Sequence, residues 1–281
     1  MTDFTDHYPD KPLSKPETAF FARVLQCIQC TQPEEKSDCA TRLLHDWQTN
    51  QLAWPDTSAL QDYSMPGHPE KPLLVPPREL PRRSVNTLQG RAALLHSIAH
   101  IEFNAINLAL DAVYRFRDMP RPFYTDWLGV AAEEAYHFTL VDRHLHALGY
   151  RYGDFAAHNG LWEMAMRTKD SALVRMAIIP RGMEARGLDA TPAIMEKLKT
   201  SGDTHAMDIL KIILRDEISH VEIGTRWFNY LCDSQNLSRQ ETFEQLMRRF
   251  INGRVKLPLH RQARISAGFT EAELDFLEGL V

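Results

Sequence analysis

The clearest pattern in the sequence begins after residue 87, where apolar side chains recur every three or four positions in four long segments. This spacing is typical of amphipathic α-helices, which place such positions on one face. We expect four helices, at about 88–117, 122–148, 171–199 and 203–231. Four long amphipathic helices, with a longer connecting segment between the second and third, predict a four-helix bundle.

The rest of the chain has other patterns. Residues 1–16 are polar and proline-containing, whereas residues 17–50 have the periodicity of two short helices. Residues 51–87 hold many prolines, which remove backbone donors, so we expect an extended arm packed on the bundle. The tail, 238–281, predicts two short helices around a loop. The expected divisions are an N-terminal region of helices and arm, the bundle and a C-terminal helical tail: 1–87, 88–235 and 236–281.

Composition adds mainly exclusions. The net charge of −5 gives no global basic field of the kind that attracts nucleic acid. Four cysteines in 281 residues are too few for a disulfide-stapled fold. The N-terminus has no apolar signal region, and no apolar run approaches the ~20 residues that span a bilayer. We therefore expect a cytoplasmic protein without a membrane partner.

Ionisable residues lie on the apolar face of each long helical segment. Burying an unpaired carboxylate costs several kcal/mol, so a group of four needs compensating charge. Two divalent cations would balance four carboxylates, and two neutral imidazoles would complete the ligand set without adding charge. The predicted metal ligands are Glu102, Glu134, His137, Glu184, Glu217 and His220.

The spacing of these residues supports this interpretation. Glu134 and His137 form one Glu-x-x-His motif, Glu217 and His220 form another, and each pair shares a helix face. A single glutamate precedes each motif by 32 or 33 residues, so the two halves repeat. This is the pattern of di-iron carboxylate bundles. An oxygen- and nitrogen-rich set favours two iron ions, or a manganese–iron pair, over zinc-thiolate chemistry.

The sequence also resembles a known family. The two Glu-x-x-His motifs with their upstream glutamates are similar to those of the ferritin-like superfamily. The stretches VPPRELPRR, AHIEFNAINLALDAVYRF, EARGLDAT and RQARISAGFTEAEL resemble an uncharacterised ferritin-like family, domain of unknown function 455, over about residues 65–275. The resemblance implies an all-α, ferritin-like four-helix bundle with an N-terminal helical, proline-rich arm and short C-terminal helices. A tRNA hydroxylase that acts on isopentenyl-type adenosines is a more distant analogue in fold and ligands only.

Two further acidic residues directly precede the glutamates of the motifs, Glu133 and Asp216. In di-iron relatives a residue at this place often accepts a hydrogen bond from the outer nitrogen of a ligand imidazole, which fixes the tautomer. The alternative is that both are surface acids. A second alternative concerns Glu184, because Arg181 and Arg186 are close enough in sequence to pair with it.

The resemblance implies an oxidoreductase that activates O2 and oxidises or hydroxylates an organic substrate, either a small molecule or a nucleic acid. It would need an electron donor and would act as a monomer or small homo-oligomer. The alternatives are an iron-binding or ferroxidase protein without an organic substrate, and an interaction scaffold with a vestigial site. No catalytic residue beyond the ligands is predicted. We expect Gly224 to leave room near the ligands.

Three other signals remain open. Cys27-x-x-Cys30, with Cys39 and His45, could bind zinc or form a redox pair, although buried thiols are the default. The basic segment 248–264 could bind phosphate or RNA, although we favour a solvated loop or pairing with acidic groups. Prolines at two positions of the third helix predict irregularity: Pro180, which must break a hydrogen bond, and Pro192, a candidate interruption.

Overall fold

The computed structural model describes residues 19–81, 83–251 and 255–280, and within these ranges the regular structure is helical, with no strands. The fold class is therefore confirmed as all-α. The expectation for residues 1–16 lies outside the described residues. The region before the bundle contains α1 (Phe20–Gln29), α2 (Pro33–Gln48) and a single 3-10 turn, η1 (Pro77–Glu79).

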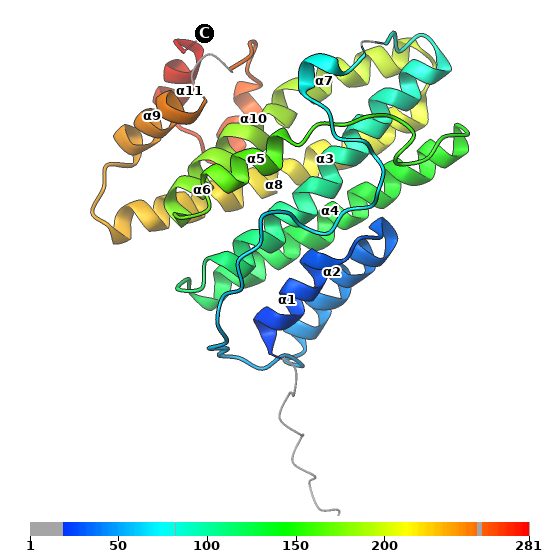
Figure 1. The fold of residues 1–281 in the computed structure, drawn as a ribbon. Coiled ribbons are helices and arrows are strands. Elements are labelled where there is room, and N and C mark those ends of the chain that lie inside the picture. Colours follow the sequence, from blue (N-terminus) through cyan, green and yellow to red (C-terminus); the bar gives the residue numbers. More distant parts are fainter. Residues whose placement is uncertain (1–18, 82, 252–254, 281) are drawn as a thin grey trace, which may run out of the picture.

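Four helical rods form the bundle, as the periodicity predicted. α3 (Leu88–Arg115) and α4 (Arg121–Ala147) make one pair. A composite rod pairs with α8 (Thr204–Ser234), and the two pairs meet where α4 packs on α8 (Figure 1). The composite rod consists of α6 (Ala172–Ile178), η2 (Ile179–Glu184) and α7 (Ala185–Thr200).

Local chemistry fixes several helix ends. Thr87 caps α3 by accepting a hydrogen bond from the backbone N–H of Gly90, and Asp203 caps α8 in the same way through Ala206. Pro122 lies in the first turn of α4, where its missing N–H costs nothing. Gly149, directly after that helix, has a φ of +83°, a left-handed conformation that glycine adopts without strain.

The third rod differs from the single helix that we expected. Its middle turn, η2, is π-helical and contains Pro180, which has no N–H for the regular ladder. The predicted irregularity at Pro180 is thus present, whereas Pro192 lies inside α7 and does not end it. Glu184 is the last residue of η2, so one predicted ligand sits on the irregular turn.

The N-terminal region packs on the first helix pair. α1 contacts α3, α2 contacts α4, and the arm then crosses α3 (Figure 1). The arm is held by backbone bonds from Val75 N to Ala157 O at 2.9 Å and from Ala157 N to Leu73 O at 3.0 Å. The indole N–H of Trp162, in α5 (Gly160–Arg167), also donates to the carbonyl oxygen of Ser64 at 2.7 Å. The proline-rich arm is therefore extended and anchored.

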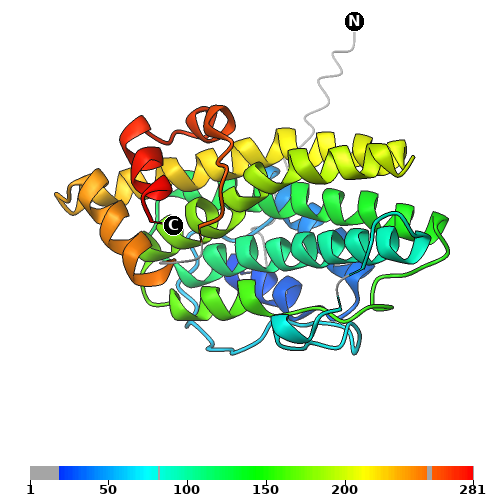
Figure 2. The same cartoon turned by 90° about the horizontal axis from the view of Figure 1, so that it is seen from above.

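The C-terminal tail gathers at one end of the bundle (Figure 2). It contains three short helices and not the two that we expected, because a turn after Ser266 separates the last two. Their bounds are Arg239–Phe250 for α9, Arg261–Ser266 for α10 and Glu271–Glu278 for α11. In the described part of the chain, no helix is long and apolar enough to cross a membrane.

Candidate metal centre

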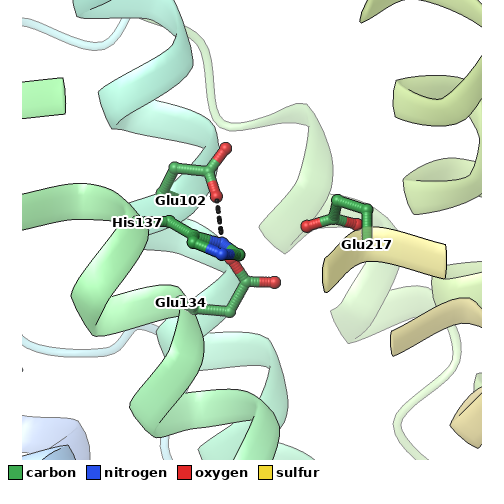
Figure 3. Close-up of side chains that lie close together, drawn as sticks. All are labelled: Glu102, Glu134, His137 and Glu217. Atoms are coloured by element: carbon green, nitrogen blue, oxygen red, sulfur yellow. Dashed lines mark hydrogen bonds and ion pairs between the residues drawn. The ribbon is translucent and has the colours of Figure 1, made fainter. Parts of the chain in front are cut away.

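The predicted ligands converge in the middle of the bundle. Glu102 projects from α3, Glu134 and His137 from α4, and Glu217 from α8 (Figure 3). Each offers one ligand atom, and these atoms lie within 4.8 Å of one another. His220 completes the centre from α8 and is fully buried. Apolar helix faces thus bring together groups that are 115 residues apart in the sequence.

The two imidazoles turn the same nitrogen toward the carboxylates. Nδ1 of His137 lies 3.4 Å from Oε2 of both Glu102 and Glu134. Nδ1 of His220 lies 3.0 Å from Oε1 of Glu134 and 3.4 Å from Oε1 of Glu217. Glu134 therefore reaches both imidazoles, one with each oxygen. A carboxylate in this position can contact groups on both sides of the cluster.

The opposite nitrogens pair crosswise between α4 and α8. Nε2 of His137 lies 3.1 Å from Oδ2 of Asp216, and Nε2 of His220 lies 2.7 Å from Oε2 of Glu133. An imidazole that donates through Nε2 keeps the lone pair of Nδ1 for a cation. The residues placed just before the two motif glutamates thus hold the partner helix's histidine, and not the histidine of their own helix.

Glu184 is close to the centre but is not part of its tight cluster. Its Oε2 atom is buried and has no hydrogen-bond partner among the described residues. The two arginines considered as its partners do not pair with it. Arg181 donates to Glu273 at 2.8 Å, and Arg186 forms no ion pair within the described ranges. A buried salt bridge therefore does not account for this carboxylate.

The pKa values of these groups reflect crowded negative charge. Burial, followed by the charges of Glu217 and Glu134, raises the pKa of Glu184 to about 8. Burial and the Glu134 charge likewise raise the pKa of Glu102 well above its usual range. Burial alone would lower the pKa of His137, but hydrogen bonds that its imidazole donates to Glu102 and Glu134 raise it to about 11. These shifts mean that the crowded carboxylates favour bound positive charge, which protons or cations can supply.

The donor set fits a metal centre. Oε2 of Glu184 is buried without a hydrogen-bond partner among the described residues, and Oε2 of Glu102 and Nδ1 of His220 face only the other charged groups of the cluster. Such buried atoms are costly unless something binds them. Carboxylate oxygens with imidazole nitrogens suit iron or manganese, and no thiolate is present in the cluster. A buried Glu/His cluster that could hold a metal is therefore present.

One expectation about the surroundings was not met, and one open alternative finds no support. A Cβ atom at Gly224 would lie 2.3 Å from Cγ of Pro180, so this glycine makes room for the proline and not for a ligand. The cysteines do not assemble with His45 into a metal cluster within the described ranges. Cys27 and Cys39 are buried free thiols, in keeping with the default interpretation.

Comparisons with known proteins place the chain in a family. Residues 29–275 match the model of the family described as "Protein of unknown function (DUF455)". The chain belongs to this family. It is also 45% identical, over 274 residues, to an uncharacterized protein of Haemophilus influenzae, a match that covers 92% of this chain and 94% of the relative. No solved structure matches the chain. The DUF455 model spans all six converging residues.

Proposed function

We propose that this DUF455 protein is a di-metal, and specifically di-iron, carboxylate oxidoreductase that uses O2 to oxidise or hydroxylate an organic substrate. The crosswise pairing of His137 with Asp216 and of His220 with Glu133 carries the proposal. In an interaction scaffold, surface acids would not be expected to fix two buried imidazoles in one tautomer. A metal centre requires this arrangement, because each imidazole must present a nitrogen lone pair to a cation.

Charge supports two cations in preference to one. Four carboxylates converge on two imidazoles, and Glu134 reaches both rings with separate oxygens. One divalent ion would leave two negative charges buried, whereas two ions balance all four. One ion would lie between Glu102, His137 and Glu134, and the other between Glu217, His220 and Glu134. Glu184 would supply the remaining carboxylate.

Two bound irons would supply the electrons with which O2 is reduced. The protein's own residues do the rest. Glu133 and Asp216 hold the Nε2 protons of the histidines, so each Nδ1 stays unprotonated when a cation binds. α3, α4 and α8 exclude bulk water, since Glu102, Glu134, His137 and His220 are all buried. The irregular turn η2 keeps Glu184 at the edge of the cluster.

The proposed reaction balances with an external reductant. One oxygen atom of O2 enters a C–H bond of the substrate and the other leaves as water, which requires two electrons and two protons from outside. The substrate would be a small molecule or a nucleic acid, and an electron-donor protein would supply the electrons. An iron-storage function is less well supported. The anchored arm and the α1–α2 pair cover α3 and α4, and so would limit the surfaces through which chains could assemble into a closed storage shell.

The first test is stoichiometry followed by turnover. Protein loaded anaerobically with ferrous iron should hold two irons per chain by elemental analysis. With that iron fixed and a reductant in excess, O2 consumption should continue over many turnovers without iron release. A storage protein would instead stop until fresh ferrous iron arrived, and would accumulate mineral. Failure to bind metal at all would remove both functions.

A further inference from the structure

A cavity lies between the third rod and the C-terminal helices, and none of the proposed metal ligands lines it. It opens between α7 and the C-terminal helices and has a volume of about 280 Å³. Part of that space is open to solvent, so the cavity is shallow and suits a small ion or one end of a longer molecule. The residues that line it and matter here are Arg181, Arg186, Asp189, Lys256 and Arg264.

The two buried guanidinium groups of this cavity are only partly satisfied. Arg264, 3% exposed, donates through Nε and Nη2 to Asp189 at 3.0 and 2.7 Å, but its Nη1 has no partner in the described part of the chain. Arg181, 1% exposed, donates through Nη2 to Glu273, and both its Nε and its Nη1 are without partners there. Buried donors of this kind are costly to leave unpaired.

Positive charge is in excess around the cavity. Four basic side chains and one acidic side chain line it, and Glu273, the partner of Arg181, adds a second negative charge. Two positive charges are therefore left over. Within the described ranges, neither Arg186, which is half-buried, nor Lys256, which is exposed, forms an ion pair. These two lie toward the solvent side, where an anion would enter.

The buried arginines are held in place before any ligand arrives. The guanidinium of Arg181 stacks among three phenylalanine rings, 4.3 Å from the centroid of Phe243, 4.6 Å from Phe269 and 4.8 Å from Phe228. Asp189 holds Arg264 through two parallel bonds. Preorganised donors lose little conformational entropy on binding. A planar guanidinium also matches the oxygens of a phosphate group.

We propose that this cavity is an anion site that binds a phosphate group, as free phosphate or as the phosphoryl end of a small phosphomonoester. Arg181 and Arg264 form its floor, and Arg186 and Lys256 form its entrance. The site shares the turn η2 with the metal cluster, since Arg181 and Glu184 both belong to it. Its evidence is independent of the metal-centre proposal, because none of the lining residues is a proposed metal ligand.

Calorimetric titration of the full chain tests the site. Inorganic phosphate and glycerol phosphate are the probes, with acetate and chloride at matched ionic strength as references. The double variant R186Q/K256Q should weaken phosphate binding about tenfold or more, as loss of a charge-assisted hydrogen bond predicts. The matched variant K197Q/K199Q removes the same charge from exposed positions of α7 outside the cavity and should bind as the wild type does.

Three results would overturn the proposal. They are phosphate binding that does not saturate, equal weakening of phosphate binding by both double variants, and binding of acetate and chloride that is as tight as that of phosphate. The variant Glu134→Ala, which should lose both metal ions, separates this site from the metal centre. It should keep phosphate binding, whereas loss of binding in that variant would put the anion on the metals and overturn the assignment. Tighter binding of glycerol phosphate than of phosphate assigns the site to a phosphomonoester, and the reverse order assigns it to free phosphate.

Discussion

The two halves of the bundle carry the same ligand pattern but are built differently. In the first half, α3 and α4 are regular helices, and Glu102 and Glu134 are 4% and 1% exposed. In the second half, the turn η2 interrupts the rod, and both Glu184 and Glu217 are only half-buried. The regular half is thus the fixed wall of the centre. The irregular half is the side at which a ligand could shift or a substrate could approach.

The largest expected effect distinguishes the two motif glutamates. Glu134 reaches both imidazoles, whereas Glu217 reaches only His220. Glu134→Ala should therefore abolish binding of both metal ions, whereas Glu217→Ala, which removes a ligand of one ion only, should lower the metal content from two ions per chain toward one. Elemental analysis after anaerobic iron loading measures the difference. Helicity by circular dichroism should be retained, because removing a carboxylate also relieves repulsion.

Glu222→Ala is the matched control, since it removes from α8 a glutamate whose side chain is 44% exposed and pairs with Arg226, outside the cluster. Equal metal content in the Glu134 and Glu217 variants would contradict the asymmetry. Unchanged content in both would mean that the cluster does not bind metal.

A second prediction concerns the pH dependence of the metal-free protein. The pKa of Glu184 is raised to about 8, from an ordinary value of 4.5, by burial and then by Glu217 and Glu134. The folded chain thus holds a proton that the unfolded chain has released, so the free energy of unfolding should fall as pH rises from about 4.5 to about 8. The neutral variant Glu184→Gln should lose much of this fall, on the order of 1.4 kcal/mol per pKa unit.

Urea unfolding of chelator-treated protein at several pH values measures this effect. Glu222→Gln, on α8 but outside the cluster, should keep the wild-type slope. Parallel curves for wild type and Glu184→Gln would show that Glu184 is charged in the folded protein, and that the irregular half does not store a proton at this position.

A third prediction compares the outer carboxylates. Asp216 is 18% exposed, whereas Glu133 is 54% exposed, so water can replace Glu133 more easily. Asp216→Ala should weaken metal binding by about 10-fold or more, and Glu133→Ala by less. Competition with a chromophoric chelator gives both affinities. A larger loss in Glu133→Ala would show that the short 2.7 Å contact outweighs its exposure.

Much of this architecture could be predicted from the sequence, because the signals are local. The periodicity of α3, α4 and α8 and the Glu-x-x-His spacing each act within one helix. The geometry of η2 could not be predicted, since Pro180 indicates a break without fixing how the turn is remade. Partners that are distant in the sequence could not be predicted either. Arg181 donates to Glu273, 92 residues away, and Arg264 donates to Asp189, 75 residues away. The basic segment 248–264 was expected to form a solvated loop or to pair with acidic groups; Arg264 does pair with an acid, but the sequence could not identify that acid as Asp189.

The smallest expected effect tests how tightly the irregular turn is held. A Cβ atom at Gly224 would lie 2.3 and 2.4 Å from Cγ and Cβ of Pro180, so Gly224→Ala should force η2 away from α8. We expect a loss of about 1–3 kcal/mol in the free energy of unfolding, the usual cost of overpacking. Gly129 in α4 and Gly187 in α7 meet nothing within 4 Å. Alanine at either should instead stabilise by about 0.5–1 kcal/mol through helix propensity.

Urea denaturation of the three single variants separates these opposite signs within one series. The double variant Gly224→Ala with Pro180→Gly, which removes both Cβ and Cγ of residue 180, adds the decisive comparison. If the proline ring is the obstacle, the second substitution should recover most of the lost stability, because the atoms that clash are removed. Gly224→Ala should also lower metal affinity, because η2 contains Pro180 and ends at Glu184, and the second substitution should restore that affinity. Stability recovered without metal affinity would mean that the π-helical turn itself, and not only its packing on α8, sets the position of Glu184.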